Sequence, residues 1–407
     1  MQSLAWLRMM AGTLLLLPAS SRAHRLVFVF RQLMKSTPTP SSVGVPREIK
    51  PQEKRVALIP STAAELVRDG HRVFVEKGAG AGAGYPDVMY ERAGATMVDS
   101  HEGVFEQAEL IVKVKEPQAS EIPLLGPKHI LFTYLHLAAD AGLTRGLMDC
   151  GATCIAYETI EVNRRLPLLE PMSEIAGRMS ALVGAYHLGT QNGGRGTLLG
   201  GVPGVLPGRV CVIGGGAAGV NAARVAMGMG ADVTILEVDL ERMRFLDVTM
   251  GSTHTLYSNE ANLMEILPRV DLLIGAVLVP GAKAPKLITR SMLREMQPGT
   301  VVVDIAVDQG GCCETTRPTT HESPTYLEED VLHYCVANMP AAYARTATQA
   351  LTNITSKYVT ELAGSGLFGA IAKIPALAGG VNVHQGKVTC PAVAEAHGLQ
   401  AVHFPAA

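Results

Sequence analysis

Aromatic and charged residues are both scarce in this sequence. Of its 407 residues, 5% are aromatic and 18% are charged, and one is tryptophan, whereas 42 are glycine. This balance suits helices packed closely on a sheet better than an aromatic-rich β-sandwich. A hydrophobic share of 47% excludes a disordered chain and is enough for a large core. At about 100–200 residues per domain, we expect two domains.

Three further absences exclude classes of function. The net charge is −2, so no excess of positive charge favours nucleic acid or an anionic membrane surface. No run reaches the roughly 18 uncharged apolar residues that a membrane span needs. The seven cysteines are too few and too irregular for a secreted disulfide scaffold, and neither Cys150 with Cys154 nor Cys312 with Cys313 has a common zinc spacing. We interpret them as reduced thiols.

Residues 1–43 differ from the rest, because the first acidic residue is Glu48 and only basic charges precede it. The apolar run 14–17, followed by small residues, resembles a signal peptide, whereas scattered Arg and Ser without acid resemble an organelle transit peptide. Alternatively, the start codon is placed too early and Met34 begins the protein. We favour the last two equally over secretion. We therefore expect a cytoplasmic protein, or a mitochondrial-matrix protein if the leader is a transit peptide.

From Val43 onward, short β-branched runs alternate with helical patterns, which predicts an α/β fold with mostly parallel sheets. We expect strands at 72–76, 110–114, 130–134, 209–213, 233–237, 272–276, 301–305 and 334–337. We expect helices at 61–69, 86–93, 172–187, 220–229 and 347–362. A glycine-rich loop, 193–208, would lead into a second domain, and the last of these helices would return the chain to the first.

A dinucleotide-binding fingerprint begins the second domain. Gly214, Gly216 and Gly219 form G-x-G-x-x-G directly after an expected strand and at the start of a helix. The first glycine permits a tight turn, the second lets the backbone approach a pyrophosphate, and the third lets the helix lie close on the strand. Glu237 ends the next strand, where it would bind ribose hydroxyls and repel a 2′-phosphate, with Asp239 as the alternative. The motif predicts NAD as the cofactor, in preference to NADP.

Charged residues follow the expected strands of the first domain, and open α/β sheets bind ligands at strand carboxyl ends. Arg55 precedes an apolar run, and Lys115 ends the run that starts at 110. Lys113 shares its face by the two-residue period, so either lysine could meet a ligand. His136 follows the strand at 130–134 and suits acid–base catalysis. The alternatives are a surface cation, an edge lysine and a hydrogen-bonded core histidine.

Asp308 lies beyond the strand at 301–305 of the nucleotide domain. A carboxylate there would lie near a nicotinamide and could hold an amine or an iminium by charge. The alternative is a turn-forming aspartate ahead of the pair Gly310 and Gly311. The joint occurrence of these charges with a cofactor motif favours an enzyme.

Ten segments together resemble NAD-dependent alanine dehydrogenase, of the alanine dehydrogenase/pyridine nucleotide transhydrogenase family. They run in order from about Val43 to the C-terminal part of the chain, at 45–50 (VPREIK), 55–58 (RVAL), 112–117 (VKVKEP), 131–139 (LFTYLHLAA), 156–159 (AYET), 171–174 (PMSE), 200–205 (GGVPGV), 275–282 (GAVLVPGA), 304–311 (DIAVDQGG) and 336–340 (VANMP).

The resemblance implies two α/β domains around a cleft. One is a Rossmann-type doubly wound NAD-binding domain at 168–344, and the other is a discontinuous flavodoxin/Rossmann-like substrate domain at 44–167 and 345–407. The implied reaction is the reversible oxidative deamination of L-alanine to pyruvate and ammonium, in L-alanine catabolism or biosynthesis, by a homohexamer. The alternative is a transhydrogenase-type NAD(H)-binding subunit. Neither nucleic acid nor a membrane is expected as a partner.

The resemblance also implies roles for single residues. Arg55 and Lys115 bind the substrate, which separates Lys115 from Lys113, and His136 and Asp308 are catalytic. The cofactor is held by the three glycines and by Ser173, Ala217, Ala218, Glu237, Arg242, Ser258, Val277, Leu278, Ile305, Ala306, Val307, Asp308, Arg317, Val336, Ala337, Asn338 and Met339. Two positions depart from the family, which usually has Asp at Glu237 and, where it binds a divalent ion, His at Ser365. We therefore expect no metal.

Overall fold

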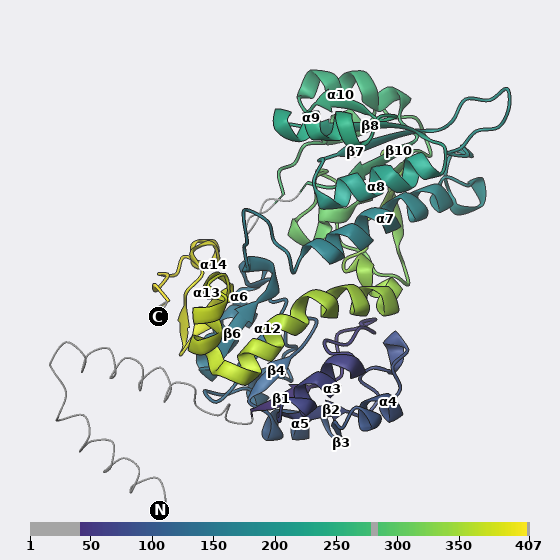
Figure 1. Ribbon diagram of the computed structural model, residues 1–407. Helices are drawn as coiled ribbons and strands as arrows, with labels where there is room; N and C mark the ends of the chain where they lie inside the picture. Colours follow the sequence, from purple (N-terminus) through teal and green to yellow (C-terminus); the bar gives the residue numbers. More distant parts are fainter. Residues whose placement is uncertain (1–40, 278–283, 405–407) are drawn as a thin grey trace, which may run out of the picture.

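The computed structural model describes residues 41–277 and 284–404 and contains two sheets, which lie in two lobes (Figure 1). The leader, the expected cofactor residue Leu278 and the segment around it lie outside the described residues. Both sheets are mostly parallel and are covered by helices on both faces, because their strands are apolar on both sides. The expected α/β class is confirmed.

The first sheet has the order β15-β14-β6-β5-β4-β1-β2-β3. Its strands are β1 (Ser42–Val45), β2 (Arg72–Glu76), β3 (Thr96–Val98), β4 (Leu110–Val112), β5 (Ile130–Thr133), β6 (Thr153–Ala156), β14 (Val381–His384) and β15 (Lys387–Val388). Strands β14 and β15 pair antiparallel and add the C-terminal segment to the sheet. Its helices are α3 (Pro60–Arg68), α4 (Asp87–Arg92), α5 (His101–Gln107), α6 (Ala141–Cys150), α13 (Leu377–Gly380) and α14 (Pro391–Ala396).

The second sheet has the order β12-β13-β11-β10-β7-β8-β9, with β12 antiparallel. Its strands are β7 (Arg209–Ile213), β8 (Asp232–Glu237), β9 (His254–Tyr257), β10 (Leu272–Gly275), β11 (Val301–Asp304), β12 (Thr325–Glu328) and β13 (Val331–Tyr334). Its helices are α7 (Glu170–His187), α8 (Ala217–Gly228), α9 (Leu240–Thr249), α10 (Glu260–Ile266) and α11 (Arg290–Leu293).

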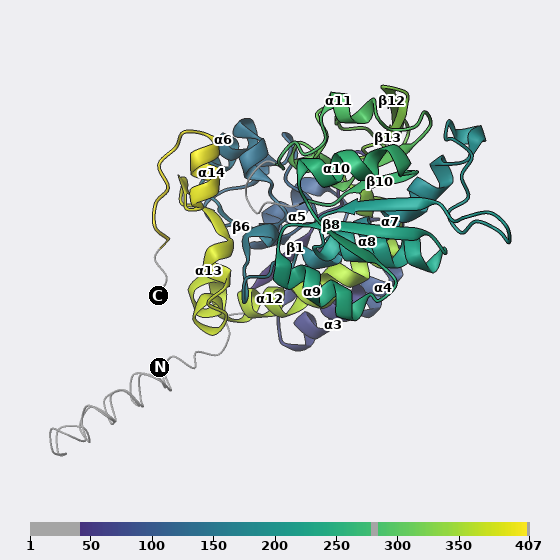
Figure 2. The same cartoon turned by 90° about the horizontal axis from the view of Figure 1, so that it is seen from above.

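Helix α12 (Ala344–Lys373) runs from the second lobe to the first, where it packs against α3 (Figure 1). Its backbone breaks at Gly366, whose φ of 65° is left-handed and suits glycine. Beyond it, α13 and α14 lie beside β6 and α6 in both views (Figure 2). The C-terminal segment therefore completes the first sheet.

Strand β13 and helix α12 differ most from the sequence prediction, while α8 begins three residues before the expected 220 and β4 ends two residues before the expected 114. Strand β13 begins at Val331, three residues before the expected 334–337. The predicted position was wrong: the strand is Val331–Tyr334, and its His333 is fully buried and bonded to Thr315 and to a carbonyl oxygen. Helix α12 is longer than the expected 347–362, because the residues beyond 362 keep an apolar face on the core.

Each sheet reverses its strand order once, between β4 and β1 and between β10 and β7. At such a point the loops from the strand carboxyl ends diverge and leave a crevice for a ligand. The candidate site residues follow β1, β4 and β5 in the first sheet and β7, β10, β11 and β13 in the second.

Candidate active site

Arg55 lies in the loop after β1, and its side chain is almost completely buried. Its Nε and Nη2 donate to the two carboxylate oxygens of Glu53 at 2.7 and 2.6 Å. Burial alone would raise the pKa of Glu53, but the charge and hydrogen bonds of Arg55 lower it to about 2. One edge of the guanidinium is thus already occupied, and a ligand must approach the Nη1 and Nη2 end.

Asn338 joins the two lobes at that end. It follows β13 with a left-handed φ of 63°, and its Oδ1 accepts from Arg55 Nη2 at 2.6 Å. Its Nδ2 donates to Glu53 Oε2 at 2.8 Å, and its backbone N–H donates to Asp308 Oδ2 at 3.4 Å. Sequence reasoning gave Asn338 only a cofactor role and missed Glu53, although Glu53 lies two residues before Arg55.

The two lysines beyond β4 have different surroundings. Lys113 is fully buried, and its Nζ lies 3.0 Å from Glu48 Oε2 and 2.7 Å from Glu121 Oε1. Lys115 has no carboxylate within ion-pair distance among the described residues. Burial lowers the pKa of Lys115, while the charges of Asp308 and Glu116 oppose that shift. Of the two, Lys115 is the lysine whose ammonium is available to a ligand.

His136 follows β5 and occupies a left-handed turn with φ of 51°. The turn is held by Glu158, whose Oε1 accepts from the backbone N–H groups of Leu135 and His136 at 3.0 and 2.6 Å. The imidazole stacks on Tyr134 at 6.0 Å between ring centroids. Within the described ranges no hydrogen bond to the ring nitrogens is found, so either nitrogen is available for proton transfer.

Asp308 lies in the short helical turn Ile305–Gln309 after β11, and Ile305, Ala306 and Val307 precede it there. Its charge opposes the lowered pKa of Lys115, a residue of the other lobe. Arg55, Lys115, Asp308 and Asn338 therefore meet between the carboxyl ends of the two sheets. The structure brings these predicted residues together, and His136 lies in the turn after β5, the strand next to β4.

The glycine loop after β7 has the backbone that the motif predicts. Gly214 has φ of 98°, and a Cβ at Gly219 would lie 1.8 Å from the carbonyl oxygen of Gly214. A Cβ at Gly216 would meet nothing within 4 Å, so that side of the loop is open. Helix α8 begins at Ala217, and its first N–H groups face this opening, as in sites that bind phosphate.

Glu237 lies against the same loop. Its Oε2 accepts from Gly215 N at 2.7 Å, and its Oε1 accepts from the amides of Val238 and Asp239. Asp239 instead caps α9 by accepting from Glu241 N and Arg242 N. Arg242 Nε donates to Gly215 O at 2.6 Å. Of the two acids that the sequence left open, Glu237 is the one beside the glycines.

The other expected cofactor positions lie at several places around this loop. Val277 follows β10, Ser258 follows β9, and Val336, Ala337 and Met339 follow β13, whereas Ala218 starts α8 and Ser173 lies in the first turn of α7. The Arg317 guanidinium lies 3.9 Å from the ring centroid of Tyr326. All except Ser173 and Ala218 follow strands of the second sheet, directly or in the loops beyond.

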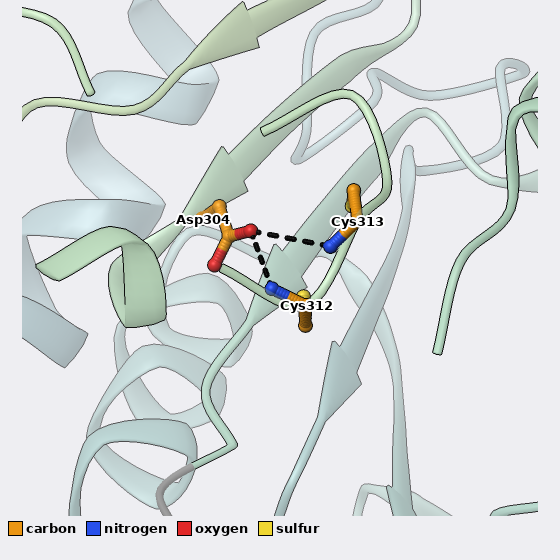
Figure 3. A group of neighbouring side chains, drawn as sticks. All are labelled: Asp304, Cys312 and Cys313. Carbon is orange, nitrogen blue, oxygen red and sulfur yellow. Dashed lines mark hydrogen bonds between the residues drawn. The ribbon is translucent and has the colours of Figure 1, made fainter. Parts of the chain in front are cut away.

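Asp304, Cys312 and Cys313 form a buried group at the end of β11 (Figure 3). Asp304 Oδ2 accepts from Cys312 N, Cys313 N and Thr316 Oγ1, and its Oδ1 accepts from Ala306 N. A hydrogen bond with Cys313, together with burial, raises the pKa of Cys312 well above the usual value, which disfavours the thiolate that a metal requires. The carboxylate therefore clamps the turn that carries Asp308.

Glu361 lies on α12, where the departure at Ser365 led us to expect no metal. Its Oε2 accepts from Lys373 Nζ at 2.7 Å, so an ammonium neutralises the carboxylate.

In the part of the chain that the structure describes, no helix combines the length and apolarity needed to cross a membrane.

Comparisons with known proteins extend over both lobes. The family models "Alanine dehydrogenase/PNT, N-terminal domain" and "C-terminal domain" match residues 44–176 and 180–391. The chain is 56% identical to an alanine dehydrogenase of Halomonas elongata over 88% of its length and 98% of that protein. It is 52% identical to an alanine dehydrogenase of Mycobacterium tuberculosis over 86% of its length and 95% of that protein.

Two solved structures are similar to this chain over most of its length. A structure of L-alanine dehydrogenase has a TM-score of 0.83 at 51% identity and covers 87% of this chain and 98% of its own. A transhydrogenase from Sinorhizobium meliloti has a TM-score of 0.73 at 25% identity and covers 86% of this chain and 99% of its own.

Proposed function

The chain belongs to the alanine dehydrogenase/PNT family, and we propose that it catalyses the NAD-dependent oxidative deamination of L-alanine. In the balanced reaction, L-alanine, NAD⁺ and water give pyruvate, ammonium, NADH and a proton, and the reverse is a reductive amination. The observation that carries this proposal is the meeting of Arg55 and Lys115 of the first lobe with Asn338 and Asp308 of the second. The relatives named alanine dehydrogenase support it.

The residues around the glycine loop fit a dinucleotide. The open side of Gly216 and the start of α8 suit the pyrophosphate, and Glu237 suits the adenosine ribose. The longer Glu side chain reaches back to Gly215, so it lies beside the loop despite the usual Asp. The chemistry that NAD⁺ supplies when bound is acceptance of a hydride at its nicotinamide ring.

On the substrate side, Arg55 orients the substrate carboxylate through its Nη1 and Nη2 end, where it now bonds Met172 and Asn338. Lys115 stabilises negative charge on the substrate oxygen through its ammonium group. His136 moves the proton between that oxygen and water. Asp308 holds the cationic nitrogen of the amine or iminium by charge.

We propose the same domain division as the sequence suggested, with 44–167 and 345–407 around the first sheet and 168–344 around the second. We also propose the homohexamer that the resemblance implies. The loop between α7 and β7 supports self-association, because Leu198, Val202, Val205 and Leu206 are all more than half exposed there. Sedimentation of the wild type and of Val205→Asp tests this, with a smaller species expected for the variant.

We propose a cytoplasmic location, and the cysteines are compatible with it. All seven are free thiols, and five of them are buried, which fits a reducing compartment.

The test of the function is NADH oxidation by the purified protein with pyruvate, with and without ammonium, repeated with NADPH. Loss of NADH absorbance that depends on ammonium and is much weaker with NADPH is expected. A transhydrogenase-type protein would instead bind NADH without consuming pyruvate. That outcome would contradict the proposal.

A further inference from the structure

A chain of ion pairs joins five side chains inside the first lobe. It consists of Glu76, His101, Glu121, Lys113 and Glu48, and we call it the buried ion chain. His101 Nδ1 lies 2.7 Å from Glu76 Oε2, and its Nε2 lies 3.1 Å from Glu121 Oε1. Lys113 Nζ then bridges Glu121 and Glu48 at 2.7 and 3.0 Å. None of these groups touches the residues proposed for chemistry except through Glu48.

Glu48 is the end of the buried ion chain that contacts the backbone of Lys115. Its Oε2 pairs with Lys113, while its Oε1 accepts from the backbone N–H of Val114 at 2.6 Å and of Lys115 at 3.4 Å. The carbonyl of Lys115 is held in turn by Thr133 Oγ1 at 3.0 Å. The backbone that carries Lys115 is therefore fixed by side chains on both sides.

The place of Glu48 in the chain makes this contact long-range. Glu48 lies in the loop after β1 that leads to Arg55, and Lys115 lies in the loop after β4, the strand next to β1. One carboxylate thus joins the two loops that carry the proposed substrate-binding residues. Because the Glu48 side chain is only 3% exposed, water cannot replace its hydrogen bonds if they are lost.

Charge explains why Glu48 needs Lys113. Burial raises the pKa of Glu48, and the Lys113 ammonium is the largest influence that lowers it. As a carboxylate, Glu48 can accept on both oxygens at once, from Lys113 and from the two amides.

We propose that Glu48 is a positioning residue that fixes the Lys115 ammonium in the cleft and thereby sets the affinity for the 2-oxo acid. It acts through the backbone of Val114 and Lys115 and touches neither substrate nor cofactor. The expected effect on the affinity for the 2-oxo acid rests on the proposed function. The expected effect on the position of Lys115 does not.

The test compares Glu48→Gln with Glu121→Gln in the full chain. Both substitutions remove one buried carboxylate from Lys113. Glu48 accepts from the amides of Val114 and Lys115, whereas Glu121 accepts from the amide of Gln118, three residues beyond Lys115. We expect similar losses of thermal stability. We expect the KM for pyruvate to rise about 10-fold in Glu48→Gln and to stay within about 2-fold in Glu121→Gln, with NADH affinity unchanged in both. Equal KM values in the two variants would overturn the proposal.

If Glu48→Gln does not fold, Glu48→Asp takes its place. Asp keeps the charge for Lys113 but is one methylene shorter, so it cannot serve Lys113 and the amides together. An unchanged pyruvate KM in Glu48→Asp would contradict the positioning role, whereas a raised KM supports it.

A second readout does not depend on catalysis. An amine-acylating reagent, followed by mass spectrometry of the peptide with Lys115, gives the pH midpoint of its labelling. In the wild type, we expect the midpoint for Lys115 to lie below the midpoint for exposed lysines. In Glu48→Gln we expect it to move toward the midpoint for exposed lysines, and in Glu121→Gln we expect it to stay unchanged. If the wild type shows no pyruvate turnover, the proposed function fails while this shift still tests Glu48.

Discussion

In the first sheet, the loops after β1 and β4 present charged side chains that are buried and fixed by other charges, as in Arg55 with Glu53 and Lys113 with Glu48. In the second sheet, the loop after β7 presents backbone amides and glycines, and its geometry needs few side chains. In the first sheet the strand order reverses between β4 and β1, and in the second sheet it reverses between β10 and β7. The loops after β1, β4 and β7 therefore lie at equivalent crevices of the two sheets. The comparison teaches that a dinucleotide can be held by local backbone geometry. A small polar substrate, in contrast, requires side chains placed by distant parts of the chain.

The largest effect is expected for His136→Ala, which removes the proposed proton carrier from the first lobe only. We expect kcat to fall about 10³-fold, while NADH binding by fluorescence titration stays within a few-fold. A parallel loss of NADH affinity would show that the two crevices are not independent, and would make His136 a structural residue.

Lys113 and Lys115 allow a comparison of a structural and a substrate-binding lysine within the loop after β4. Lys113→Met leaves the buried Glu48 carboxylate without a cation and Glu121 with His101 alone, and is expected to lower the free energy of unfolding by about 3–5 kcal/mol. Lys115→Met removes an ammonium that has no ion-pair partner among the described residues, so stability should change by less than about 1 kcal/mol while pyruvate turnover is lost. Urea unfolding of both variants checks this, and the reverse order of stabilities would refute the assignment.

Two glycines in the loop after β7 and at the start of α8 provide a matched pair of alanine variants. Gly219→Ala places a Cβ 1.8 Å from the Gly214 carbonyl oxygen, so it should lower the melting temperature and weaken NADH binding together. Gly216→Ala meets nothing within 4 Å and has an ordinary φ of −70°, so it should fold normally. Its Cβ would still stand where a pyrophosphate approaches, and we expect about 10-fold weaker NADH binding, or about 1.4 kcal/mol. Unchanged binding would place the pyrophosphate elsewhere.

The smallest effect is a pH dependence of the first lobe. Burial alone would lower the pKa of His101, but hydrogen bonds and charges from Glu121 and Glu76 raise it to about 9. A raised pKa in the folded state means that this stabilisation is complete below about pH 6.5 and is lost as the pH rises through about 9. The melting temperature should therefore fall between pH 7 and 9 in the wild type, and fall less in His101→Gln. Equal slopes would show that His101 is not charged in the folded protein.

The sequence by itself determined most of the second lobe's site and the fold class. The glycine spacing, the helix that follows it and the acid at the end of the next strand are local features, because each acts within a few residues or on the neighbouring strand. The alternation of β-branched runs and helical patterns predicted parallel sheets for the same reason. Strand β13 was misplaced by three residues, and its run includes a histidine that only the folded structure shows to be buried.

Only the tertiary structure decided what the charged residues of the first lobe do. The two-residue period places Lys113 and Lys115 on one face, and nothing local separates them; Glu48, 65 residues from Lys113, does so by pairing with one and holding the backbone of the other. Asn338 reaches Arg55 across 283 residues of sequence. The energy of a buried charge depends on the partner that folding brings to it, and that partner leaves no trace in the spacing of nearby residues.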